Sequence, residues 1–175
     1  RYNFNNENGK DYSGNGYDLS EQVNVSYDEG RTSDALTLKG NESYVETPVE
    51  NLGINSTIEF WVKRDANSTD EEQILFESDK GAIKAVQKET GKLGFSREWH
   101  DYSFNYELPK GEWVKIKLDT ALTVTKLYVN DELVDTLGIN ATGGKWASLV
   151  IPLNRIGSTE KAFQGQIDDV IVEKK

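Results

Sequence analysis

The chain is dominated by short stretches in which apolar and polar residues alternate, and this pattern narrows the folds open to it. In residues 58–63, Ile58, Phe60 and Val62 share one face and Trp61 lies on the other. Residues 113–118 alternate in the same way, with lysines on the polar side. Alternation with a period of two is typical of sheet strands. Because the face of Trp61 is also apolar, we expect the strand over 58–63 to be covered on both sides.

Several more segments carry the same strand pattern. Further strands are expected at 35–39, 43–46, 73–77, 82–88, 92–97, 102–106, 149–152 and 167–173. A hairpin is expected over 125–134, because Asn130 and Asp131 tolerate the positive φ of a tight turn. Segments 19–25 and 70–73 each have room for at most about one helical turn. The sequence therefore predicts an all-β fold, an antiparallel two-sheet β-sandwich or jelly roll.

Length and composition indicate one folded domain over residues 1–175. The 175 residues match about one domain, and 36% of them are hydrophobic, which rules out overall disorder. No repeat or linker-like tract divides the chain. The sequence opens at Arg1 without a signal-peptide pattern, so we interpret it as a domain excised from a longer protein.

Charge and residue usage exclude several classes of partner. Twenty Lys and Arg against thirty Asp and Glu leave a net charge of −10, which repels nucleic acid and anionic lipid. No apolar run approaches the roughly 20 residues of a membrane span. With no cysteine and one histidine, His100, the chain has no disulfide, zinc-thiolate or thiol-nucleophile chemistry. This composition favours a bacterial protein that is secreted or associated with the cell wall.

Five motifs in order carry a family resemblance. They are the opening over 3–18, Thr57–Lys63, Gly111–Ile116, Leu127–Leu133 and Gly165–Val170. Together they resemble the laminin-G-like modules of the concanavalin A-like lectin and glucanase superfamily. The resemblance implies a jelly roll with one concave sheet, appended to secreted glycan-degrading enzymes of Gram-positive bacteria. It also implies that the parent protein is a glycoside hydrolase.

The chain itself is expected not to be an enzyme. Hydrolases of this superfamily place catalytic acids in a Glu-x-Asp-x-x-Glu run, and the acidic segments 107–112 and 166–173 lack that spacing. A pair of carboxylates at a fixed separation is what glycoside hydrolysis requires. His100 lies near Ser96 and Asp101 in sequence only, and we interpret it as an exposed loop residue or one stacked on Trp99.

Two tryptophans are candidates for sugar contact. Trp99 lies in the dense run 97–102, and Trp146 follows the glycine-containing loop 142–145. Aromatic faces stack on the apolar side of sugar rings, whereas packing between loops is the alternative for each residue. Trp61 and Trp113 are assigned to the core. The polar and aromatic candidates around the two tryptophans are Arg97, Glu98, Tyr102, Tyr106 and Lys84.

The resemblance also implies a structural Ca²⁺ that joins the N-terminal segment to the last strand. Asp18 and either Asp168 or Asp169 match such a site best, with Asn15 or Asn3 as a further ligand. Carboxylate and amide oxygens are the ligands that calcium prefers. The alternative is that the segment 11–18 is a tight turn and Asp168-Asp169 a solvated strand end.

The expected function is that of a noncatalytic carbohydrate-binding module that directs a secreted bacterial enzyme to its glycan. Its partners would be the glycan and the catalytic domain of the same polypeptide. The alternative is a structural accessory domain that packs on the catalytic domain and binds no sugar. Exposure separates the two, because a binding module keeps Trp99 or Trp146 in solvent and a spacer buries both.

Overall fold

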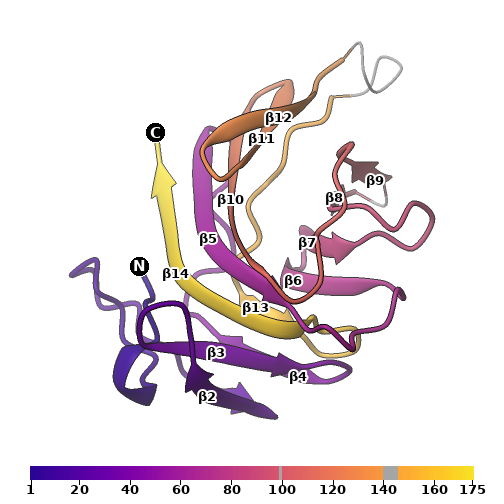
Figure 1. The fold of residues 1–175 in the computed structure, drawn as a ribbon. Helices are drawn as coiled ribbons and strands as arrows, with labels where there is room; N and C mark the ends of the chain where they lie inside the picture. Colours follow the sequence, from indigo (N-terminus) through magenta and orange to yellow (C-terminus); the bar gives the residue numbers. More distant parts are fainter. Residues whose placement is uncertain (99, 140–145) are drawn as a thin grey trace.

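The computed structural model describes residues 1–98, 100–139 and 146–175, which form two antiparallel seven-stranded sheets (Figure 1). The first, here called the β7 sheet, has the order β1-β4-β13-β6-β7-β8-β9. Its strands are β1 (Gln22–Val23), β4 (Ser43–Glu46), β13 (Arg155–Ser158), β6 (Gln73–Ser78), β7 (Gly81–Val86), β8 (Gly94–Arg97) and β9 (His100–Ser103). This arrangement confirms the predicted β-sandwich.

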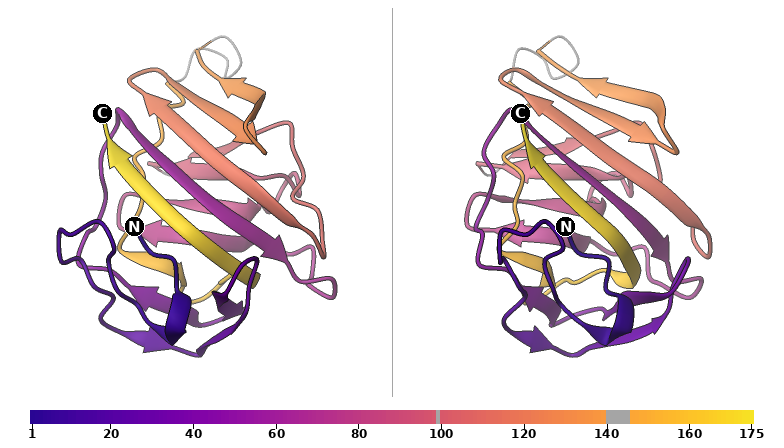
Figure 2. Two further views of the ribbon diagram at one scale, coloured as in Figure 1. Left: turned by 60° about the vertical axis from the view of Figure 1, so that its left-hand side comes forward. Right: turned by 90° about the vertical axis from the view of Figure 1, so that its left-hand side faces the viewer.

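The second sheet, here called the β5 sheet, has the order β12-β11-β10-β5-β14-β3-β2. Its strands are β12 (Glu132–Leu137), β11 (Val124–Val129), β10 (Trp113–Ala121), β5 (Ser56–Arg64), β14 (Gln164–Lys174), β3 (Asp34–Lys39) and β2 (Val25–Glu29). Figure 1 shows β5, β10 and β14 as long strands that curve around the β7 sheet, and Figure 2 shows the same two layers from the side.

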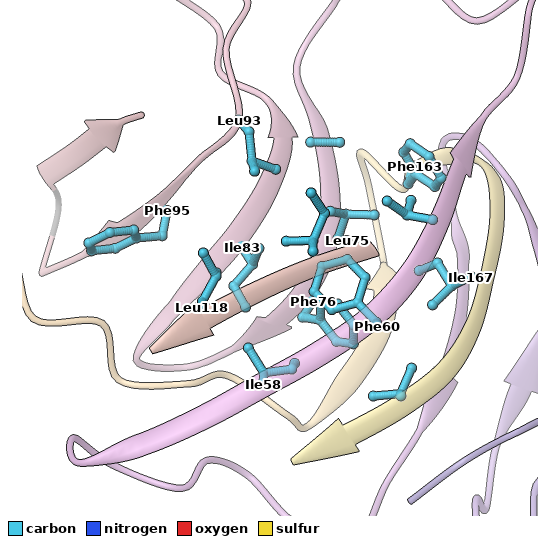
Figure 3. Close-up of a cluster of buried hydrophobic side chains, with 14 of the residues drawn as sticks. Ile58, Phe60, Leu75, Phe76, Ile83, Leu93, Phe95, Leu118, Phe163 and Ile167 are labelled. Atoms are coloured by element: carbon cyan, nitrogen blue, oxygen red, sulfur yellow. The ribbon is translucent and has the colours of Figure 1, made fainter. Parts of the chain in front are cut away.

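The core lies between the two layers and follows from the alternation in the sequence. Every second residue of β5 and β10 is buried, as the period of two requires. Phe60 of β5 meets Phe76 of β6 with ring centroids 4.9 Å apart, and Figure 3 shows this pair among the surrounding aliphatic side chains. The predicted hairpin is also present, with Asn130 and Asp131 at positive φ between β11 and β12.

The outward face of the β5 sheet corrects the assignment of two tryptophans. Trp61 and Trp113 are half-buried on this face rather than in the core. The expected cover over Trp61 comes from a single side chain, because the Arg31 guanidinium stacks on its ring at 4.2 Å. The helical turns considered for 19–25 and 70–73 are absent, since the first segment contains β1 and the second leads into β6. The one helical element in the described residues is the 3₁₀ turn η1 (Asn5–Glu7).

The strand expected at 149–152 is an extended segment outside both sheets. Its residues alternate inward, and Ala147, Leu149, Ile151 and Leu153 are buried in the core. A proline at position 152 removes one ladder donor, and the backbone is held partly by side chains of the β5 sheet. We call residues 146–153 the crossing segment. Figure 1 shows it descending between the two layers toward β13. None of the described residues forms a helix with the length and hydrophobicity of a membrane span.

Candidate functional site

A pocket of about 290 Å³ lies where the β8–β9 hairpin meets the start of the crossing segment. Its lining consists of Arg97, Glu98, His100, Tyr102 and Trp146, and we call it the rim pocket. Four of these five residues are sequence-predicted site residues. His100 was interpreted as an exposed loop residue or one stacked on Trp99; it is exposed, but it lies in β9 rather than in a loop, and it belongs to the lining. Its pairing with Arg97 across the hairpin is what brings it there.

Trp146 is the most exposed aromatic side chain of the described chain, at 55% relative exposure. The backbone that follows it is fully buried and firmly held. The Thr125 hydroxyl donates to the Ala147 carbonyl at 2.7 Å and accepts from the Leu149 amide at 3.0 Å. The Thr120 hydroxyl donates to the Leu149 carbonyl at 2.8 Å. An exposed indole therefore projects from a segment with little freedom to move.

Arg97 and Tyr102 hold the same segment from the other side of the pocket. The Arg97 guanidinium donates to the Ser148 carbonyl at 3.0 Å and also to the Ser148 hydroxyl. The Tyr102 ring is buried against Phe95 at 5.1 Å, and its hydroxyl lies 3.5 Å from the Trp146 carbonyl. These contacts give Arg97 and Tyr102 a positioning role as well as a place in the lining.

A larger groove of about 700 Å³ adjoins the rim pocket on the outward face of the β7 sheet. Glu98, which follows β8 in the hairpin turn, lines both hollows, and the paired residues place them on opposite faces of the β8–β9 hairpin. Lys84 lies in the groove, where its ammonium pairs with Glu72 at 2.6 Å and Asp101 at 2.9 Å. Burial disfavours the charged form of Lys84, but the two carboxylates outweigh it and raise its pKa. Lys84 is therefore a fixed cation within an ion-paired network.

Of the predicted contact residues that the structure describes, Tyr106 is not brought to either hollow. Tyr106 is half-buried against the core and belongs to the lining of neither hollow. Burial, together with the charge of Glu112, raises its pKa. Trp99 lies outside the described residues, so its contact with sugar stays a prediction.

The predicted calcium ligands are separately engaged by protein groups. Asp18 accepts the Asp11 amide at 2.8 Å, and the Asn15 side chain donates to the Ser13 hydroxyl at 2.9 Å. Asp11, which the sequence analysis did not single out, organises this loop by accepting from Ser13 and Tyr17. These contacts are those of the tight turn considered as the alternative.

The two C-terminal candidates differ from each other. Asp169 faces cations, with Arg1 at 3.3 Å and Arg31 at 3.7 Å. Asp168 is buried, accepts the Asp169 amide at 2.7 Å and has one oxygen without a partner. Over residues 1–98, 100–139 and 146–175, no three acidic or histidine side chains form a group that fits a metal ion. The donors as arranged do not fit calcium.

Comparisons with solved structures show the same fold. Domain 4 of AbnA, an extracellular arabinanase of family GH43 from Geobacillus stearothermophilus solved with arabinotriose, is 19% identical, with a TM-score of 0.75 over 99% of this chain and 90% of that one. The ligand-binding domain of botulinum neurotoxin serotype D, solved with N-acetylneuraminic acid, is 16% identical with a TM-score of 0.67 over 94% and 44%. Carbohydrate-binding module CBM66 from Bacillus subtilis is 12% identical with a TM-score of 0.50 over 88% and 94%.

A search of curated protein sequences gave no match. The sequence profile described as "Concanavalin A-like lectin/glucanases superfamily" matches residues 39–175, which includes β4 through β14 and both layers of the sandwich. The match covers well over half of the chain and agrees with the observed sheets. The chain therefore belongs to the concanavalin A-like lectin and glucanase superfamily.

Proposed function

We propose that this chain is a noncatalytic carbohydrate-binding module and that the rim pocket is its sugar site. The observation that carries the proposal is Trp146, whose exposed indole projects from a buried, hydrogen-bonded segment at the mouth of the pocket. An aromatic face held in solvent binds the apolar side of a sugar ring with little loss of conformational entropy.

In the proposed complex the sugar ring stacks on Trp146, while Glu98 and His100 bond its hydroxyl groups. Three relatives of the fold support a ligand of this class: an arabinanase domain solved with arabinotriose, a toxin domain solved with N-acetylneuraminic acid, and a module named as carbohydrate-binding.

The wider role we propose is to keep a secreted bacterial enzyme near its glycan. A module linked to a catalytic domain raises the effective concentration of substrate without a new contact in the active site. The parent protein would then be a secreted or wall-associated glycoside hydrolase, as the arabinanase relative is. The structural alternative, a domain that only packs on its catalytic neighbour, predicts no affinity for sugar.

A titration with Trp146→Ala tests the proposal. The wild-type domain should bind an oligosaccharide from a panel that includes arabinotriose and lactose, as measured by calorimetry. Trp146→Ala should weaken binding by about two- to tenfold, because stacking on an aromatic side chain contributes roughly 0.5–1.5 kcal/mol. Trp113→Ala is the matched control, since Trp113 is a half-buried tryptophan of the opposite sheet. A folded domain that binds nothing in the panel would favour the structural alternative.

A further inference from the structure

We propose that Glu98 determines which glycans enter the site, and that the site takes uncharged oligosaccharides and rejects acidic ones. This inference rests on the proposed function. It follows from the position of Glu98 between the two hollows, from its backbone conformation and from the charges around it.

Glu98 lies at the junction of the rim pocket and the groove and contributes to both linings. Its side chain is 80% exposed, and its nearest cation is Arg97 at 3.8 Å. Arg97 is itself bound to Ser148. The Glu98 carboxylate therefore has most of its acceptor capacity free for a ligand in the rim pocket.

The backbone at Glu98 adopts a conformation that costs stability. Its φ is 48°, a left-handed conformation that is strained for a residue of this kind. Among the ten non-glycine residues that the structure describes with positive φ, five are Asn and two are Asp. Those residues tolerate the conformation well, and a glutamate does not. Glu7 has the same conformation outside both linings, so it is the combination of strain with a place in the pocket lining that suggests a functional position for Glu98.

The lysines of the adjoining groove are already paired with carboxylates of the protein. In the described part of the lining, Lys84 is paired with Glu72 and Asp101, Lys161 with Glu72, and Lys80 with Asp79. A carboxylate on a ligand would meet Glu98 and find each of these cations already engaged. A neutral sugar instead offers hydroxyl donors, and a carboxylate can accept from two adjacent hydroxyl groups at once.

Calorimetry with two neutral and two acidic probes tests the inference. Arabinotriose and lactose are the neutral probes, and trigalacturonate and 3′-sialyllactose are the acidic ones. Wild-type protein should bind its better neutral probe at least about tenfold more tightly than either acidic probe. Glu98→Gln should weaken the neutral interaction by about tenfold to a hundredfold, since hydrogen bonds to charged groups contribute that much, and should narrow the gap to the acidic probes.

Glu98→Asn separates ligand recognition from backbone strain. It should lose affinity like Glu98→Gln, while its Tm rises by about 2–4 °C because Asn tolerates the left-handed conformation. Glu7→Asn is the matched control, because Glu7 is an exposed glutamate at φ 54° that belongs to neither lining. The Tm of Glu7→Asn should rise by a similar amount, and its affinity for the neutral probe should stay the same.

Each outcome has a distinct meaning. Tighter or equal binding of an acidic probe would overturn the selectivity and leave the proposed function standing. Unchanged affinity in Glu98→Gln would remove Glu98 as the selecting residue. A folded wild-type protein that binds none of the four probes would contradict the proposed function, and this inference with it.

Discussion

Asp168 is an ionisable residue in an environment that disfavours its charged form. Its side chain is buried, and one carboxylate oxygen has no partner. Burial raises its pKa from 3.8 to about 6, and the charge of Asp169 adds to this, while the Asp169 amide and Arg31 act in the opposite direction. The folded state therefore holds the proton more tightly than the unfolded state does.

Asp168→Asn should accordingly stabilise the protein at neutral pH. Because the pKa is raised on folding, the group makes the free energy of unfolding fall as pH rises from about 4 to about 6, by at most about 3 kcal/mol. Asp168→Asn does not titrate, so its free energy of unfolding should exceed that of wild type at pH 7.5 and be similar to that of wild type at pH 4. Urea unfolding at both pH values measures the difference.

The control for this prediction is Asp79→Asn, which removes a carboxylate whose side chain is 60% exposed between β6 and β7. It makes the same change in net charge and should shift stability by no more than about 0.5 kcal/mol. If Asp168→Asn instead lowers stability at pH 7.5, the carboxylate has a partner in solution, and a bound cation becomes the first candidate.

At the scale of single residues, the sequence predicted which charged and aromatic side chains were available, but it did not predict which protein groups each of them contacts. Arg97 was predicted to bond sugar hydroxyls, but its guanidinium is engaged by Ser148, a residue 51 positions away. Lys84 carries the predicted positive charge, but its ammonium forms ion pairs with Glu72 and Asp101. Such partners come from other segments of the chain, so local residue patterns do not reveal them.

Among the elements, strands with one face in the core were the most predictable. β5 and β10 alternate over nine residues each, and their inward residues are those expected from the sequence. The crossing segment alternates as well, and for that reason it was predicted as a strand. Alternation indicates that one face is buried, but it does not indicate which groups form hydrogen bonds with the backbone.

The Thr125 hydroxyl makes two of the hydrogen bonds that hold the crossing segment, which gives a prediction for Thr125→Val. Valine keeps the shape of threonine but leaves the Ala147 carbonyl and the Leu149 amide without their partner. Two buried groups left unsatisfied cost about 2–4 kcal/mol, so Tm should fall by roughly 5–10 °C. Since Trp146 begins this segment, affinity for sugar should fall as well.

Thr136→Val provides the comparison, because Thr136 is exposed on β12 and its side chain faces no buried backbone. Thermal unfolding and calorimetry of both variants separate the effects. Equal Tm values for the two variants would show that the Thr125 hydroxyl does not hold the segment.

At the scale of the whole molecule, the sequence indicated the superfamily and the sandwich, whereas the site required the structure. The rim pocket joins Tyr102 to Trp146 across 44 positions of sequence. Its lining depends on how a hairpin of the β7 sheet meets a segment held by the β5 sheet. No pattern within either segment contains that information.

Calcium is the remaining prediction for the whole molecule, and chelation tests it. A structural ion that joins the N-terminal segment to β14 would stabilise the folded state by about 2.7 kcal/mol at a hundredfold excess over its Kd. In this structure Asp18 is bound by an amide, Asp169 lies between two arginines, and the N-terminal segment is tied to β14 by backbone hydrogen bonds between Tyr2 and Val170. We therefore expect EDTA and millimolar Ca²⁺ to give Tm values within about 1 °C of each other. A rise of about 5 °C or more with Ca²⁺, lost in Asp18→Asn, would instead establish the metal site and require these side chains to rearrange around it.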